Sequence, residues 1–209
     1  MDPSATIYCD MDGVLVDFFA GAKRIFARYS EDRVPALWLK RSRTIPPAIR
    51  ELNARFGRRY KLRARDQLEI TPIRQFVLSA ISFGAGEFFA SLPPLRDGVD
   101  ELWPFLHRSG RRVALLSAPI TNRRGVQGPS AEEGKRSWAA RWLEPAPAEI
   151  VIRPSKYKQG VAVQRGVANL LIDDRASTIE RWRAKGGVGV LHQPGRSSET
   201  IARLEAPGL

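Results

Sequence analysis

Two aspartates separated by one residue, Asp10 and Asp12, are the side chains of this sequence best suited to chemistry. They follow an apolar run from Ala5 to Cys9, which is typical of a buried parallel strand, and they precede a turn-forming Gly13. Ligands of parallel sheets bind just beyond the carboxyl ends of the strands. Two such close carboxylates repel each other unless a cation such as Mg²⁺ offsets their charge. Asp10 could then attack phosphorus and Asp12 could act as general acid and base. The alternative is that both acids cap the following helix.

Polar residues also close three later apolar runs. Ser117 ends one of them, and its hydroxyl and backbone amide could hold a phosphate oxygen. Asp173 and Asp174 form a second acidic pair at the end of another run. Lys156 and Lys158 follow the remaining run, and either of them could supply a cation between the acids and a phosphate. Together, these strand ends predict one site.

The elements that must position these residues alternate between strands and helices. We expect strands at 5–9, 112–117, 149–152, 169–173 and 188–191, helices at 18–29, 97–107, 134–143, 176–185 and 200–204, and a loop at 123–133. Such alternation predicts an α/β fold with a doubly wound, Rossmann-like parallel sheet.

Residues 30–94 interrupt this alternation, since helical patterns follow Pro46-Pro47 and cover about 73–83, and no convincing strand is present. We therefore predict a small, mainly helical cap at 21–94, inserted after the first strand, and a catalytic core made of 1–20 and 95–209. The aromatic residues of the insertion are more often core than ligand contacts, although one or two could stack on a base. They are Trp38, Phe83, Phe88 and Phe89.

The chain carries a net charge of +12, and most of the excess lies in the expected cap. Residues 21–94 hold 15 Lys or Arg against 6 Asp or Glu. This asymmetry indicates either a positive surface over an anion site or a nucleic-acid footprint. A compositional bias is the alternative, because arginines outnumber lysines 27 to 7.

The 209 residues contain a single cysteine, so no intramolecular disulfide can form and a reducing compartment is expected. No apolar run approaches the length of a membrane span, and no secretory leader is recognisable. We expect a cytoplasmic protein without membrane contact. With only two histidines and one cysteine, the composition argues against a zinc site.

The strand-end residues resemble the four motifs of the haloacid dehalogenase superfamily of phosphohydrolases. The motifs are Asp10-Met11-Asp12-Gly13-Val14, Leu115-Leu116-Ser117, a lysine, and Ile172-Asp173-Asp174. More narrowly, the chain resembles the 5'(3')-deoxyribonucleotidase group and its phage-encoded relatives. That likeness lies in residues 10–18, 87–94, 116–119, 134–138, 170–175 and 186–192.

This resemblance implies a Mg²⁺-dependent phosphomonoesterase with Asp10 as nucleophile and Asp12 as general acid/base. It implies that the metal is held by the Asp10 carboxylate, the Asp12 backbone carbonyl and Asp174. Asp173 would then lie nearby or act through water.

The resemblance also implies a substrate pocket. Ser117, Ala118, Lys135 and the third-motif lysine would bind phosphate, and Phe18 with Phe88 or Phe89 would lie near a nucleoside. Lys158 fits the lysine-then-alanine spacing of the group and is preferred, whereas Lys156 better fits the distance from the third strand.

The first functional hypothesis is a 5'-nucleotidase that acts on (deoxy)ribonucleoside monophosphates, which are small phosphomonoesters. The second is a phosphatase that acts on the phosphorylated end of a polynucleotide and binds its backbone through the basic cap. A catalytically retired nucleotide-binding protein is the third. The sequence leaves the base, the sugar and the choice between monomer and homodimer open.

Overall fold

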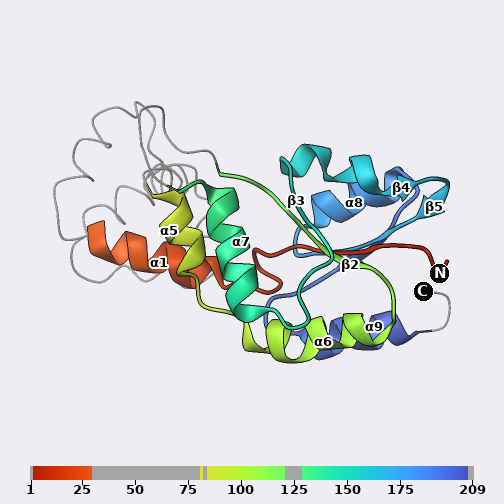
Figure 1. Ribbon diagram of the computed structural model, residues 1–209, viewed down its shortest axis with the longest axis horizontal. Helices are drawn as coiled ribbons and strands as arrows, with labels where there is room; N and C mark the ends of the chain where they lie inside the picture. Colours follow the sequence, from red (N-terminus) through yellow and green to blue (C-terminus); the bar gives the residue numbers. More distant parts are fainter. Residues whose placement is uncertain (1, 30–80, 82–83, 121–128, 207–209) are drawn as a thin grey trace, which may run out of the picture.

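A five-stranded sheet lies at the centre of the molecule, and every strand in it runs parallel to its neighbours (Figure 1). The computed structural model describes residues 2–29, 81, 84–120 and 129–206. In spatial order the strands are β3 (Ile150–Ile152), β2 (Val113–Ser117), β1 (Ile7–Cys9), β6 (Leu170–Asp173) and β7 (Val188–Leu191). The chain begins in the middle, builds outward through β2 and β3, and then crosses to β6 and β7 on the other side. The predicted doubly wound α/β fold is confirmed.

The strand register brings both acidic pairs to the same edge of the sheet. Cys9 of β1 lies opposite Leu115 of β2 and Ile172 of β6. The backbone N–H of Asp10 donates to the carbonyl of Ile172 at 2.9 Å, so Asp10 leaves β1 beside Asp173. The two acidic pairs are therefore neighbours because the strands that carry them are paired.

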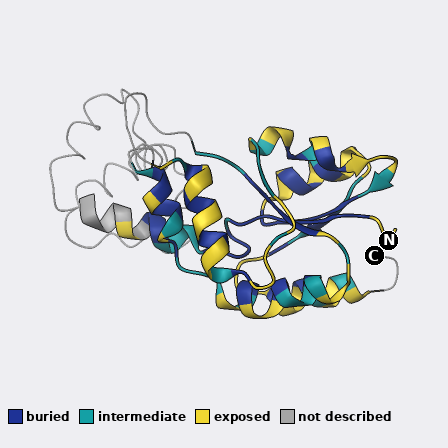
Figure 2. Cartoon of the chain, viewed as in Figure 1, coloured by how far each residue is buried: buried dark blue, intermediate teal, exposed yellow. Residues whose placement is uncertain are grey.

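One apolar core lies on the face of the sheet that receives Cys9, Leu115 and Ile172 (Figure 2). Side chains from five of the described helices complete this core. They come from α1 (Phe18–Tyr29), α5 (Ala85–Ala90), α6 (Trp103–Arg108), α7 (Ala131–Trp142) and α9 (Ser197–Glu205). A π-helical segment, η2 (Gly98–Leu102), leads directly into α6, so the helix predicted at 97–107 is present in two parts.

The opposite face of the sheet carries a second, smaller core. Tyr8 and the alternate residues of β2 and β6 pack there against α8 (Ala176–Ala184), with η3 (Ser155–Val161) beside it. The ring of Trp182 meets Tyr8 edge-on at 5.8 Å between centroids, and its indole N–H donates to the carbonyl of Asn169. Each strand is thus covered on both faces, as its continuous apolar sequence requires.

Two helix starts and one strand pair differ from the sequence-based expectation. Helix α7 begins at Ala131, inside the predicted loop, because Ser130 and Glu133 form a reciprocal capping box. Helix α9 begins at Ser197 rather than at 200. A short antiparallel pair, β4 (Val163–Gln164) and β5 (Val167–Ala168), was not expected, because two-residue strands are too short to show alternation.

Most of the expected cap falls outside the described residues, including Trp38, Phe83 and the run of arginines between 58 and 65. The described part of 21–94 contributes α1 (Phe18–Tyr29), which begins before it, and α5 (Ala85–Ala90). Helix α5 packs closely on α7, where a Cβ on Gly134 would lie 2.2 Å from the carbonyl oxygen of Gly86. The division into core and cap stays a prediction.

Among the described residues, no helix combines the length and the apolar character that a membrane crossing requires.

A buried histidine links β7 to α9. His192 is 1% exposed, and its Nδ1 lies 2.8 Å from the hydroxyl of Thr200. Burial lowers the pKa of His192 to about 4, although the nearby Asp97 works in the opposite direction. The imidazole is therefore neutral in the folded protein at neutral pH.

We expect the stability that depends on His192 to be lost as the pH falls from about 6.5 toward 4, because the unfolded chain then takes up a proton that the folded chain excludes. Between pH 7 and pH 5, the free energy of unfolding should fall by about 2 kcal/mol through this residue. Denaturant titrations of the wild type and His192→Gln at both pH values isolate the effect. An equal loss in both proteins would contradict it.

Candidate active site

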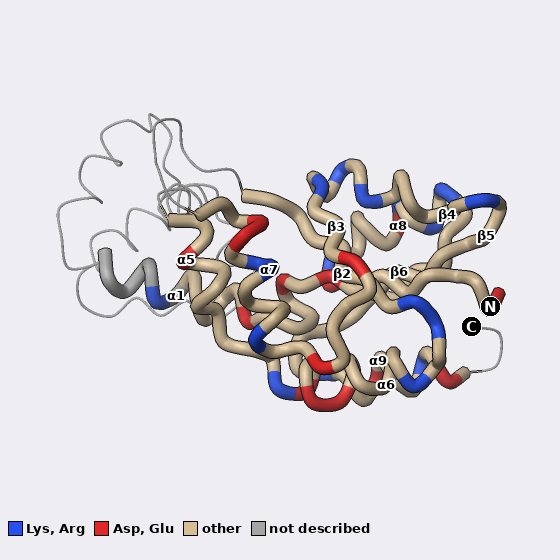
Figure 3. Tube along the Cα trace, in the orientation of Figure 1, with Lys and Arg blue, Asp and Glu red and all other residues tan. Residues whose placement is uncertain are grey.

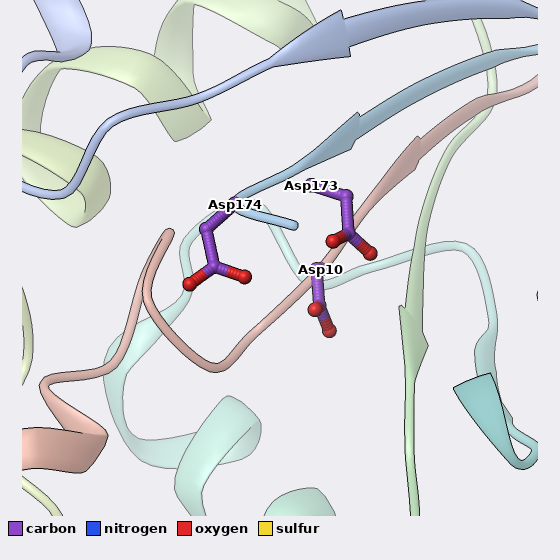
Figure 4. A group of neighbouring side chains, drawn as sticks. All are labelled: Asp10, Asp173 and Asp174. Atoms are coloured by element: carbon purple, nitrogen blue, oxygen red, sulfur yellow. The ribbon is translucent and has the colours of Figure 1, made fainter. Parts of the chain in front are cut away.

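Three carboxylates from two neighbouring strands converge at the edge of the sheet (Figure 4). Asp10 follows β1, Asp173 ends β6, and Asp174 comes next in the chain. One oxygen of each carboxylate lies within 4.8 Å of the others, and all three residues are buried. The sequence predicted that the acids would meet, and the structure brings them together.

The turn after β1 is built to fit against this cluster. The carbonyl of Met11 accepts hydrogen bonds from the N–H groups of Val14, Leu15 and Val16 at 2.9–3.2 Å, which folds the chain back sharply. Gly13 has φ +81°, and a Cβ there would lie 2.3 Å from Oδ2 of Asp174. Only glycine satisfies both the backbone conformation and this close approach.

The last residue of β1 has no direct access to solvent. Cys9 is fully buried, and its thiol donates to the carbonyl of Asp10 at 3.4 Å. Burial, reinforced by the negative charge of Asp10, raises the pKa of the Cys9 thiol well above its usual value. The thiol is thus a structural part of the strand rather than a reactive group.

Lys158 supplies the cation that holds two of the acids together. Its Nζ lies 2.9 Å from Oδ2 of Asp10 and 2.8 Å from Oδ2 of Asp173, and the side chain is 1% exposed. Burial alone would lower the pKa of Lys158, but the two carboxylates outweigh burial and raise it. Burial and the charge of Asp10 raise the pKa of Asp173 to about 6. Lys158 therefore stays charged.

Lys135 of α7 forms a second, separate bridge. Its Nζ lies 2.6 Å from Oδ2 of Asp12 and 2.6 Å from the hydroxyl of Ser117. The same ammonium lies 4.2 Å from the ring centre of Phe89 in α5. Lys135 is fully buried, so this cation joins the second aspartate to the end of β2.

Asp12 is the acid best placed to exchange a proton. Burial raises its pKa, with Lys135 acting against this and the charge of Asp10 adding to it. Its Oδ2 contacts Lys135, whereas its buried Oδ1 has no hydrogen-bond partner among the described residues. An unsatisfied buried oxygen at a site of this kind fits a group that awaits a ligand.

The balance of charge fits a divalent cation. Four carboxylates, from both acidic pairs, face two lysines, which leaves two negative charges when all are ionised. Clustered carboxylate oxygens are the ligands that Mg²⁺ prefers. Both oxygens of Asp173 are already engaged, one by Lys158 and the other by the backbone N–H of Arg175 at 2.9 Å. The acidic cluster thus fits Mg²⁺ binding.

Two further candidate residues, Ala118 and Lys156, differ in their burial and position. Ala118 directly follows Ser117 and is partly buried. Lys156 is exposed, and its Nζ lies 4.7 Å from the ring centre of Tyr157 rather than in the acidic cluster. Of the two lysines that the sequence left open, the structure places Lys158 among the acids.

The three phenylalanines form one aromatic group. Phe18 of α1 meets Phe88 at 5.6 Å and Phe89 at 6.3 Å between ring centroids, and the last two are 5.2 Å apart. Phe88 and Phe89 are buried, whereas Phe18 is only partly buried. Phe18 therefore presents the most accessible ring of the three.

The backbone N–H groups that donate hydrogen bonds to Asp10 and Asp173 could not be predicted from the sequence. The N–H of Met11 donates to Oδ1 of Asp10 at 2.8 Å, as the N–H of Arg175 does to Asp173. Every residue except proline carries such a group, so residue type gives no signal. The contact between Lys135 and Phe89 was likewise not expected, because it depends on how α5 packs on α7.

Solved structures resemble this arrangement of sheet and helices, although no protein-family model and no curated protein matches the sequence. A haloacid dehalogenase-like hydrolase, SP0104 from Streptococcus pneumoniae, superposes with a TM-score of 0.51 at 14% identity, covering 99% of this chain and 93% of that one. The chain therefore shares the overall fold of that solved structure. The HAD-hydrolase YfnB from Bacillus subtilis, solved with magnesium, gives a TM-score of 0.49 at 13% identity, covering 98% of this chain and all of that one.

Magnesium should stabilise the folded protein, because only the folded chain brings the carboxylates of Asp10, Asp173 and Asp174 together. At a concentration 100 times its dissociation constant, a ligand specific for the folded state adds about 2.7 kcal/mol. Thermal unfolding with and without Mg²⁺ measures this gain. We expect Asp174→Asn to remove most of the gain. Asp100→Asn, which changes an exposed acid by the same chemistry, should keep it. A gain that is equal in both variants would contradict the site.

Proposed function

We propose that this chain is a Mg²⁺-dependent phosphohydrolase that forms a covalent aspartyl-phosphate on Asp10. The observation that carries the proposal is that the two aspartates after β1, Asp10 and Asp12, lie in different environments. Asp10 is paired with Lys158 inside the acidic cluster, whereas Asp12 is paired with Lys135 and retains a buried oxygen without a partner in the described chain. Two carboxylates with different surroundings are suited to two different roles.

In the first step, a carboxylate oxygen of Asp10 attacks phosphorus, and the bond between phosphorus and the leaving oxygen breaks. Asp12, protonated at this stage, donates its proton to that oxygen, and burial favours its neutral form. In the second step, water attacks the phosphorus. Asp12 accepts a proton from the water, inorganic phosphate leaves, and the Asp10 carboxylate is restored.

The residues that would hold Mg²⁺ are the Asp10 carboxylate, the Asp12 backbone carbonyl and Asp174. When bound, the ion offsets charge on the acids and on the phosphoryl oxygens. Asp173 orients Lys158 through its Oδ2, while its Oδ1 accepts the backbone N–H of Arg175. Lys158 in turn fixes the carboxylate of Asp10.

Ser117, Ala118 and the two buried lysines are the candidate phosphate ligands. The Ser117 hydroxyl lies at the end of β2 and already contacts Lys135, so an incoming phosphate oxygen would meet a hydroxyl and an ammonium together. Lys156 is not part of this proposal, because it lies exposed beside Tyr157.

We infer a nucleoside monophosphate as the substrate, which makes the chain a 5'-nucleotidase. The sequence resemblance to 5'(3')-deoxyribonucleotidases supports this choice, and the partly buried ring of Phe18 could stack on a base. A screen of phosphate release from nucleoside monophosphates, sugar phosphates and end-phosphorylated oligonucleotides tests it. Preference for an oligonucleotide, together with a steep loss of turnover as salt rises, would instead favour the polynucleotide phosphatase.

Substitution of the two aspartates should separate the two chemical steps. Asp10→Asn should abolish phosphate release, because the nucleophile is lost. Asp12→Asn should still form the phosphoenzyme from 4-nitrophenyl phosphate, because that leaving group needs no proton. The rate at which water hydrolyses the phosphoenzyme should fall by roughly 10²-fold or more. Intact-protein mass spectrometry after mixing detects the added phosphoryl group. Full activity of Asp10→Asn would contradict the mechanism, and an inactive wild type that still binds nucleotide would indicate a retired site.

The two neighbouring lysines should differ sharply when each is replaced by methionine. Lys158→Met removes the only cation seen between Asp10 and Asp173 in the described chain, so kcat/KM should fall by roughly 10²-fold or more. Lys156→Met alters an exposed side chain and should leave turnover of a mononucleotide unchanged. Steady-state kinetics with thermal unfolding as a folding control provides the measurement. Equal losses in both variants would refute the assignment.

A further inference from the structure

One layer of the molecule carries almost exclusively positive surface charge. It is formed by η3, the β4–β5 pair and α8, which cover one face of the sheet (Figure 3). Between residues 153 and 185 the sequence has eight Lys or Arg and three Asp or Glu. Lys158, Asp173 and Asp174 belong to the buried site, so Glu180 is the single acid that remains on this surface. The remaining cations are Arg153, Lys156, Arg165, Arg175, Arg181, Arg183 and Lys185. We call this layer the basic face.

The cations of the basic face lack the acidic partners that some surface arginines have. On the other parts of the core, four exposed arginines pair with acids: Arg96 with Asp100, Arg112 with Glu149, Arg136 with Glu132 and Arg196 with Glu199. None of the seven cations of the basic face forms an ion pair within the part of the chain that the structure describes. A surface of unpaired like charges repels itself and is relieved by an anionic partner.

An aromatic side chain lies within this positive surface. Tyr157 of η3 is 55% exposed and, with Val163 of β4, is one of the two exposed large hydrophobic residues in the described chain. The ammonium of Lys156 lies 4.7 Å from the ring centre of Tyr157. Exposed rings among cations are the elements with which proteins bind single-stranded nucleic acid, since bases stack on the ring and phosphates meet the cations.

We propose that the basic face binds single-stranded nucleic acid. Its cations would contact the phosphates, and Tyr157 would stack on a base. Arg153 follows β3 and Arg175 follows β6, at the same edge of the sheet as the acidic cluster. A strand bound along this face therefore runs toward the candidate active site. The binding itself does not depend on the proposed hydrolysis and goes beyond it.

Fluorescence anisotropy with a labelled DNA single strand, read at several salt concentrations, tests the proposal on the full chain. The charge variant is Arg165→Gln with Lys185→Gln, and a separate stacking variant is Tyr157→Ala. The matched control is Arg96→Gln with Arg196→Gln, which removes the same number of positive charges from ion pairs elsewhere on the core. Thermal unfolding checks that each variant is folded.

The charge variant should weaken binding about tenfold at low salt and reduce the slope of log K against log salt by about 0.7 for each phosphate contact removed. Tyr157→Ala should weaken binding at least about fivefold with an unchanged salt slope. The control should bind like the wild type. Binding that is unchanged in both test variants, or weakened equally in the control, would overturn the proposal. So would binding of anionic phospholipid vesicles without binding of the DNA strand.

Discussion

Repulsion between buried carboxylates is the constraint on which the rest of this structure depends. Pairing β1 with β6 brings Asp10 and Asp173 to adjacent positions at the edge of the sheet, where water is largely excluded. Like charges in such surroundings cannot persist without compensation. The fold therefore has to deliver cations to this edge, and the positions of two lysines follow from that need.

The two lysines come from opposite layers of the molecule. Lys158 arrives from η3, on the face covered by α8, and Lys135 arrives from α7, on the other face. Each ammonium contacts one of the two aspartates that follow β1 and one residue at the end of a neighbouring strand. The active-site edge is thus the place where both helical layers are tied to the sheet. A change of packing in either layer would therefore reach the acids through one lysine, Lys135 on one face and Lys158 on the other.

The sequence predicted the strands and the acids at their carboxyl ends, because both are visible in short-range patterns, and the carboxyl ends of parallel strands share one edge of the sheet. Apolar runs that end in carboxylates identify strands and their carboxyl ends directly. The choice between Lys156 and Lys158 could not be made, because side chains two residues apart on a tight helical turn point in different directions. The contact of Lys135 with Phe89 could not be predicted either, since it joins two helices, α7 and α5, that are far apart in sequence. The net charge of the core did not indicate the basic face, because acids elsewhere on the core offset its cations.

The single cysteine, Cys9, can report how often the folded core opens. Cys9 lies in the central strand, fully buried, with a thiol that remains protonated. An alkylating reagent can reach it only when the elements that cover this face of the sheet move away from β1. The rate of thiol modification under native conditions therefore measures how often this core opens.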